Sequence, residues 1–557
     1  MRQAITALVL VQCFSGCSSD IGPDPFAGAK SGQMQNVVDS SAPAQAASMF
    51  GGSLSNDNGV PSVMYPLDST MLALNIGQLE VQWNAVEGAT VYRVRVKSKA
   101  LDLSFYVGVS VCKNLQCRYS VSSSDWLGFT TASAGQTAVL AVYSTNGSGN
   151  DVQRSTGINL SISPEDVKGG LYYFSTSQAG IMRLPFGASK ATFFEGVGAS
   201  ASADDMDQCI GCHAVSRDGK KVAAEQGGGD GFLTIVDSTT ASPTPTLGPS
   251  SNFRSNFSSF NPDGTLLLTN WAGQLSVIDV ATGQTKFTAA QGLVGGRAVM
   301  GEWSPDGQSI VFVRLPAGGK LFPEVADLRY MSAAGDWLIA DAGDIAIMPY
   351  NNGAFGTPTL LVASSNAEYN YYPSFSPDSE WVVFSTGTRI GSESLISYSS
   401  ADIGGYGISR DHFVSYDQQT SRLRMVSATG GMPIELAHAT RGQGLTTSWP
   451  KFAPFEQAND QLVFITFSSK ANYGFEVTSG MQPQIWMAAI DLKVAAQVAQ
   501  NLSVADPSYA PFWLPFQDPT TNNHETIWTE QIACSTDADC GDTGFFCEQG
   551  QCDPAPK

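Results

Sequence analysis

One pentapeptide in this 557-residue chain has the residue types and the spacing of a chemical site. Cys209 and Cys212 are separated by two residues and His213 follows directly, which gives a C-x-x-C-H sequence. This is the attachment pattern of haem c, in which two thiols bond the vinyl groups and the adjacent imidazole ligates the iron axially. The pattern therefore predicts one covalent haem c on Cys209 and Cys212, with His213 as an axial ligand of the haem iron.

Two other uses of these residues stay open. A disulfide between Cys209 and Cys212 would leave the protein without a cofactor, and a zinc site would need further ligands. The pentapeptide directly precedes a predicted strand and lacks the helical module that usually wraps the macrocycle. Met206 is too close in sequence to be an easy second axial ligand.

Six of the other cysteines are predicted to form disulfides. Cys112 and Cys117 enclose four residues, a spacing that can close a small hairpin loop in an oxidising compartment. The C-terminal segment, residues 532–557, has little core of its own and needs bridges to hold its shape. It predicts two disulfides, with three possible connectivities, among four cysteines: Cys534, Cys540, Cys547 and Cys552. Its acidic residues, Asp537, Asp539 and Asp542, are interpreted as a solvated loop rather than a calcium site.

Residues 1–17 predict an export signal. Arg2 precedes an apolar stretch that is too short to span a bilayer, and Phe14-Ser15-Gly16-Cys17 follows. This sequence resembles the lipobox of bacterial lipoproteins, which implies that Cys17 is acylated and becomes the mature N-terminus. The alternative is an ordinary secretory signal cleaved nearby. Ser18 favours the outer membrane in that family, so we expect a lipid-anchored protein on the periplasmic face or the cell surface.

The composition indicates many short strands joined by tight turns. Charged residues are only 14% of the chain, whereas aromatic residues are 10% and glycine occurs 56 times. The net charge of −20 argues against nucleic acid as a partner and against electrostatic binding to anionic lipid. Residues 18–58 contain few large apolar side chains, so they are predicted to be a flexible tether.

Internal repeats fill residues 168–531. Four segments share a turn pattern followed by an alternating apolar strand, and they begin at Ser216, Asn261, Ser304 and Ser376. In this pattern Pro presets φ, Asp caps the turn and Gly takes the left-handed position. Four carboxylates are therefore predicted to form turns rather than to catalyse: Asp218, Asp263, Asp306 and Asp378.

Repeats of about forty residues with four strands each describe a β-propeller. The Ser-Pro-Asp-Gly pattern resembles that of TolB-type, WD40-like propellers of the bacterial envelope. We count six blades and predict that the two ends of the repeat region share one blade, which removes exposed strand edges. The insertions near 314–342 and 386–418 are the predicted binding loops, because loops on a rigid scaffold carry most binding.

Residues 59–165 form a separate predicted module. Their apolar residues alternate with period two, which indicates antiparallel sheet. Trp83 on an early strand, Tyr92 on the next, and the late "TAVLAVYSTNGSG" resemble a fibronectin type III module, an immunoglobulin-like β-sandwich that usually spaces or binds. The predicted fold is thus all-β, with this sandwich, the six-bladed propeller and the small disulfide-rich C-terminal segment.

Three functions follow, in order of preference. The chain has no G-x-S-x-G, H-E-x-x-H or phosphate-loop sequence, which favours a non-enzymatic propeller that binds an envelope protein, peptide or glycan. The alternative is electron transfer or redox sensing through a haem c. A propeller hydrolase or lyase, with carboxylates that converge only in space, comes last.

Overall fold

A computed structural model describes most of the chain. The described residues are 26, 32–55, 60–148, 151–178, 180–194, 210–226, 232–239, 246–247, 253–255, 257–271, 273–289, 296–316, 343–351, 353–365, 367–388, 420–440, 445–459, 461–477, 482–541 and 544–555. Cys17, Met206, Cys209 and Asp542 lie outside these residues, as do most of the two predicted binding insertions.

The chain forms two compact units. The first contains residues 1–63, 83–118 and 139–157, and the second contains residues 64–82, 119–138 and 158–557. In the described part of the chain, no helix is long and apolar enough to cross a membrane.

The strands of the predicted N-terminal module form two sheets. One contains β1 (Gln33–Val38), β6 (Leu101–Gly108), β5 (Val91–Lys97) and β9 (Thr137–Thr145) in that order, with β10 (Gln153–Arg154) on β9. The other contains β2 (Ser62–Tyr65), β4 (Glu80–Asn84), β8 (Gln116–Ser120) and β7 (Cys112–Lys113). Beyond β9, the first sheet continues with β11 (Ile158–Ile162) and β3 (Thr70–Leu72), which pair in parallel. The helices of this region are η1 (Ala46–Phe50), η2 (Val109–Val111) and α1 (Ser123–Ala132).

Trp83 and Tyr92 explain how the two sheets pack. Both side chains are fully buried, and their rings meet edge to face with centroids 5.4 Å apart, one from each sheet. This packing confirms a β-sandwich, whereas fibronectin type III topology and the boundaries 59–165 stay predictions. The Cys112–Cys117 disulfide joins β7 to β8, as the spacing predicted.

The prediction of a flexible tether over 18–58 is wrong for part of that segment. Residues 33–38 form β1, which pairs in parallel with the edge strand β6. The side chains of β1 are mostly exposed, so apolar burial gave no signal in the sequence. Backbone hydrogen bonds to an otherwise open sheet edge provide the ordering that apolar side chains do not.

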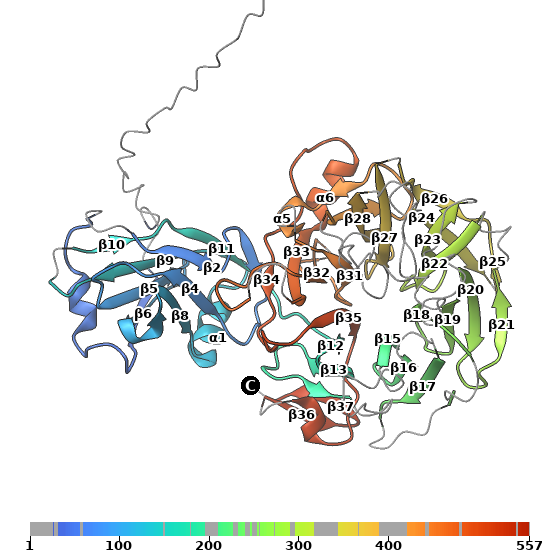
Figure 1. The fold of residues 1–557 in the computed structure, drawn as a ribbon, viewed down its shortest axis with the longest axis horizontal. Helices are drawn as coiled ribbons and strands as arrows, with labels where there is room; N and C mark the ends of the chain where they lie inside the picture. The colour runs from blue at the N-terminus through green and yellow to red at the C-terminus, as the bar shows by residue number, and fades with distance from the viewer. Residues whose placement is uncertain are drawn as a thin grey trace, which may run out of the picture. The chain divides into compact units, whose positions relative to one another are not determined.

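The second unit contains a propeller of six sheets, which are arranged in a ring (Figure 1). From the centre outward, the first three are β35 (Asn523–Thr529), β12 (Gly170–Ser175), β13 (Gly180–Pro185) and β14 (Thr192–Phe193); β15 (Ile210–Val215), β16 (Lys221–Gln226) and β17 (Phe232–Asp237); and β18 (Phe257–Phe260), β19 (Leu266–Trp271), β20 (Gln274–Asp279) and β21 (Thr285–Thr288).

The other three sheets follow in chain order. They are β22 (Gly296–Trp303), β23 (Ser309–Pro316) and β24 (Asp344–Asn351), with β25 (Ala354–Phe355) and β26 (Thr359–Val362) on β24; β27 (Glu368–Phe375), β28 (Trp381–Thr388), β29 (Arg422–Ser427) and β30 (Ile434–Glu435); and β31 (Ser448–Phe452), β32 (Leu462–Ser469), β33 (Gln484–Asp491) and β34 (Phe512–Trp513). Two short helices, α5 (Ala437–Thr440) and α6 (Leu492–Ala499), lie in the connections.

The two ends of the propeller region share one blade, as predicted. β35, from the C-terminal end, pairs antiparallel with β12 from the N-terminal end. This strand exchange closes the ring and leaves β12 without an unpaired edge. It also makes β35 the innermost strand of the closing blade, next to β15 (Figure 1).

The four predicted turn carboxylates accept hydrogen bonds from their own turns. Ser304 Oγ and Gln308 N donate to Asp306 Oδ1, for example, and Asp218, Asp263 and Asp378 accept equivalent bonds. The glycines at 219, 264 and 307 have φ between 67° and 72°, which confirms their left-handed position. In the fourth turn Ser379 takes this conformation, with a φ of 65°.

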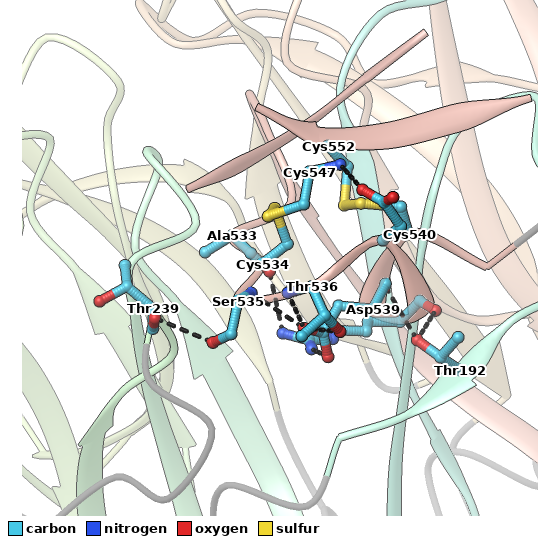
Figure 2. Close-up of a disulfide and its surroundings, with 12 residues drawn as sticks. Thr192, Thr239, Ala533, Cys534, Ser535, Thr536, Asp539, Cys540, Cys547 and Cys552 are labelled. Atoms are coloured by element: carbon cyan, nitrogen blue, oxygen red, sulfur yellow. Dashed lines mark hydrogen bonds and ion pairs between the residues drawn. A yellow bond between two sulfur atoms is a disulfide. The ribbon is translucent and has the colours of Figure 1, made fainter. Parts of the chain in front are cut away.

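The C-terminal segment is a disulfide-bonded unit on the closing blade (Figure 2). It contains η9 (Asp537–Cys540), β36 (Phe545–Glu548) and β37 (Gln551–Pro554), and its bridges join Cys534 to Cys547 and Cys540 to Cys552. Of the three possible connectivities, the structure therefore has the interleaved one. Arg183 on β13 forms an ion pair with Asp539 and donates to the carbonyl of Ala533 at 3.0 Å.

Candidate functional site

Several innermost strands of the propeller contain a β-bulge at an equivalent position. In β22, β27 and β31, two residues face one residue of the neighbouring strand, so each strand contains a β-bulge. Met300, Tyr372 and Trp449 lie in these bulges with φ of 54°, 53° and 48°, and Glu525 in β35 has a φ of 49°. Left-handed backbone is unusual for residues of this size, and such residues cluster at functional sites.

The C-x-x-C-H sequence contains the equivalent bulge of β15. The pairing between β15 and β16 shifts between Ile210 and His213, so Gly211 and Cys212 form the bulge. The described part of the motif, residues 210–213, therefore belongs to an innermost strand. Of its two cysteines, Cys212 is described and has a free thiol.

A pocket of about 160 Å³ lies where the six innermost strands converge. The turns that follow four of these strands place a proline each in its wall: Pro262, Pro305, Pro377 and Pro454. Every innermost strand also contributes at least one lining residue, among them Ala214, Ser258, Glu302, Ser374, Lys451 and Ile527. The pocket thus depends on closure of the whole ring.

Paired charges dominate the polar part of this axial pocket. Glu302 accepts hydrogen bonds from Ser374 Oγ at 2.8 Å and from Phe375 N at 3.0 Å, and it forms an ion pair with Lys451. Arg217, also in the wall, is paired with Glu530. Because these opposite charges are matched, the wall favours an uncharged polar ligand over a strongly charged one.

A smaller cavity of about 30 Å³ continues the axial pocket, and both are lined by Ser258, Glu302, Lys451 and Ile527. Aromatic side chains from neighbouring blades also line the smaller cavity. The ring centroids of Tyr372 and Trp449 are 4.8 Å apart, and those of Tyr372 and Phe257 are 6.2 Å apart.

His213 and Glu525 meet at the small cavity. Their closest approach, from Nδ1 to Oε2, is 3.9 Å, and neither imidazole nitrogen has a hydrogen-bond partner of ordinary geometry among the described residues. Burial lowers the pKa of His213 to about 3 and raises the pKa of Glu525 to about 8. At neutral pH both side chains are therefore uncharged.

The described residues around His213 do not fit a haem. The imidazole side chain is 0% exposed, and the cavity beside it, about 30 Å³, is far below the roughly 300 Å³ at which pockets for drug-sized ligands begin. The Cys212 thiol contacts Glu525, and burial raises the pKa of this thiol well above its usual value. Cys212 also packs against the apolar cluster that contains Val299 and Met300.

A metal site is not favoured elsewhere in the described chain. Three sulfurs lie within 4.8 Å of one another, those of Cys534, Cys540 and Cys552. All three cysteines are disulfide-bonded, so they offer no thiolate to a metal ion.

Sequence reasoning missed the residues of the axial pocket and of the smaller cavity that continues it. Glu302, Lys451 and Glu525 lie in three different strands, and no local spacing connects them. One signal was present in the sequence, because Pro373 and Pro450 stand inside innermost strands, where proline marks a bulge.

Comparisons with known proteins give distant likenesses of fold. No protein-family model and no curated protein matches the sequence. The structure of TolB from Acinetobacter baumannii is 13% identical with a TM-score of 0.37, over 71% of this chain and 80% of that one. The match to a nidogen/laminin complex has 10% identity and a TM-score of 0.36, and it covers 65% of this chain and 98% of that one. The match to the Myceliophteria thermophila Cps50 (Swd1) β-propeller domain has 11% identity and a TM-score of 0.31, and it covers 59% of this chain and 89% of that one. At these TM-scores the likenesses carry no argument about function, and the propeller assignment rests on strand order.

Proposed function

We propose that this protein is a lipid-anchored binding protein of the bacterial envelope, and that its propeller holds a partner at the axial pocket. The observation that supports this function is the convergence of all six innermost strands on one pocket. A pocket of this origin is rigid, because each wall residue is fixed by a blade, and preorganised sites bind at a lower entropic cost.

The pocket also limits what the partner presents. Its volume of about 160 Å³ is smaller than that of the usual pocket for a free small ligand, roughly 300–1,000 Å³. It accommodates one projecting group, such as a single side chain or a sugar unit of a larger molecule. An envelope protein, a peptide and a glycan all meet this requirement, and the paired charges favour an uncharged polar group.

Electron transfer through a haem c is not the function that the geometry favours. The imidazole of His213 and the thiol of Cys212 are engaged in packing at the axis, where the cavity is small. The binding function needs neither group to carry a cofactor.

A comparison of two lysine variants tests the proposal. Lys451→Met removes one charge of the pocket pair and leaves Glu302 partly buried without its cation, whereas Lys286→Met removes an exposed lysine that pairs with Asp279 on an outer part of a blade. The full anchored chain is used as bait, and crosslinked envelope partners are quantified by mass spectrometry. We expect recovery to fall at least about tenfold for Lys451→Met, because an uncharged partner group would have to bury the Glu302 carboxylate without its cation, which costs about 1–3 kcal/mol or more.

Equal recovery with both variants would exclude the axial pocket as the binding site. Circular dichroism and thermal unfolding of Lys451→Met show whether the propeller is intact.

The anchor itself is checked with Cys17→Ser, which we expect to move the chain from the membrane fraction to the soluble fraction.

A further inference from the structure

We infer that Gly211 and Cys212 of the C-x-x-C-H sequence form the inner-strand bulge that, with His213, seals the closing seam of the propeller, and that the sequence does not carry a haem. This inference is independent of the partner proposed above. It rests on the position of the motif, on its packing and on the space beside it.

The position of the motif repeats a feature of other blades. Met300-Gly301 of β22, Tyr372-Pro373 of β27 and Trp449-Pro450 of β31 are dipeptides that face the single residues Phe312, Phe384 and Phe467. In β15, Gly211-Cys212 faces the single residue Glu225 in the same way. The central residues of the motif thus occupy a structural position that other blades fill without cysteine.

The packing joins opposite ends of the propeller. β15 is the innermost strand of the blade that follows the closing blade in the chain, and β35 is the innermost strand of the closing blade. Cys212 and His213 of β15 both contact Glu525 of β35, through the thiol and through Nδ1 at 3.9 Å. These contacts lie at the seam where the ring closes, so the motif has a packing role that needs no cofactor.

The space that the described residues leave beside His213 does not fit a macrocycle. An axial ligand must bring its nitrogen to about 2 Å from a metal centre, as metal-bound imidazoles do. His213 faces a cavity of about 30 Å³ whose other walls include Met300, Tyr372 and Trp449, all less than 10% exposed. Among the described residues, this cavity leaves no room for a macrocycle beside the imidazole.

Haem content is the direct test. The full chain is expressed in a host with active cytochrome c maturation, beside a known c-type cytochrome, and denatured protein is examined for a Soret band and a pyridine haemochrome. We expect covalent haem in the control cytochrome and none in this protein. Haem that stays bound after denaturation, and is lost in Cys209→Ser/Cys212→Ser, would overturn the inference.

Two single variants test the packing role separately. Cys212→Ala deletes the thiol that contacts Glu525, whereas Cys212→Ser keeps a hydrogen-bond donor at the same place. We expect Cys212→Ala to lower the midpoint of thermal unfolding by about 2 °C or more, and Cys212→Ser to recover part of that loss. If both variants unfold at the wild-type temperature, the segment does not seal the seam.

Discussion

At the scale of single residues, three chemistries meet at the propeller axis: an ion pair, an uncharged imidazole and an uncharged carboxyl group. Glu302 forms an ion pair with Lys451 and accepts two further hydrogen bonds, from Ser374 Oγ and Phe375 N. His213 and Glu525 lie in a drier place, where burial favours the neutral form of each. Their environments, rather than their residue types, therefore decide which groups at the axis are ionised.

The two neutral groups have opposite effects on stability as pH changes. The pKa of Glu525 is raised to about 8, so the folded state holds a proton that the unfolded state releases near pH 4.5, and stability falls as pH rises between these values. The pKa of His213 is lowered to about 3, so stability falls as pH drops from about 6.5 toward 3.

Above pH 6.5 the contribution of His213 no longer changes with pH, and only that of Glu525 does. We expect the free energy of unfolding to decrease by up to about 1.4 kcal/mol per pH unit between pH 6.5 and 8 through Glu525. Urea titrations at several pH values measure this slope, and Glu525→Gln serves as the control that cannot ionise. An unchanged slope in Glu525→Gln would show that this carboxyl group is not the source.

At the scale of elements, the turns could be predicted from the sequence, whereas the pairing of strands that are distant in the sequence could be predicted only in part. The turn residues around Asp263 and Asp306 form their own hydrogen bonds, so a short stretch of sequence suffices to predict them. The shared blade could also be predicted, because each end of the repeat region contains only part of a blade. By contrast, β1 has mostly exposed side chains and exists because β6 offers an open edge, which no feature of residues 33–38 reveals. The axial pocket escaped prediction for the same reason, since its residues come from six strands.

The C-terminal segment gives a prediction at this scale. Its disulfides lie in one apolar cluster with Tyr172, Ile181 and Val222 of the first two blades, directly after the closing strand β35. We expect Cys540→Ala/Cys552→Ala to destabilise the propeller by about 2–4 kcal/mol, because this bridge closes a loop with a sequence separation of 12.

The matched control is Cys112→Ala/Cys117→Ala, whose bridge has a sequence separation of only 5 and lies in the first unit. Differential scanning calorimetry compares the two variants. A propeller transition that is unchanged in Cys540→Ala/Cys552→Ala would mean that the segment does not support the closing blade.

At the scale of the whole molecule, an acidic chain surrounds a pocket with matched charges. The net charge of −20 disfavours electrostatic binding to nucleic acid and to anionic lipid, so the proposed lipid on Cys17 would supply membrane attachment. Recognition at the axial pocket would then rest on shape and hydrogen bonding.

Binding of the partner should accordingly depend only weakly on salt, because the pocket charges are already paired.

Site-specific photocrosslinking tests the central claim, that the axial pocket holds the partner, most directly. A photoreactive residue replaces Pro305 in the pocket wall or, as the control, the exposed Thr285 on the outer strand β21. The anchored protein is then irradiated in intact cells. We predict a discrete covalent adduct from position 305 that is absent from position 285. Adducts of equal yield from both positions, or from position 285 alone, would contradict the claim.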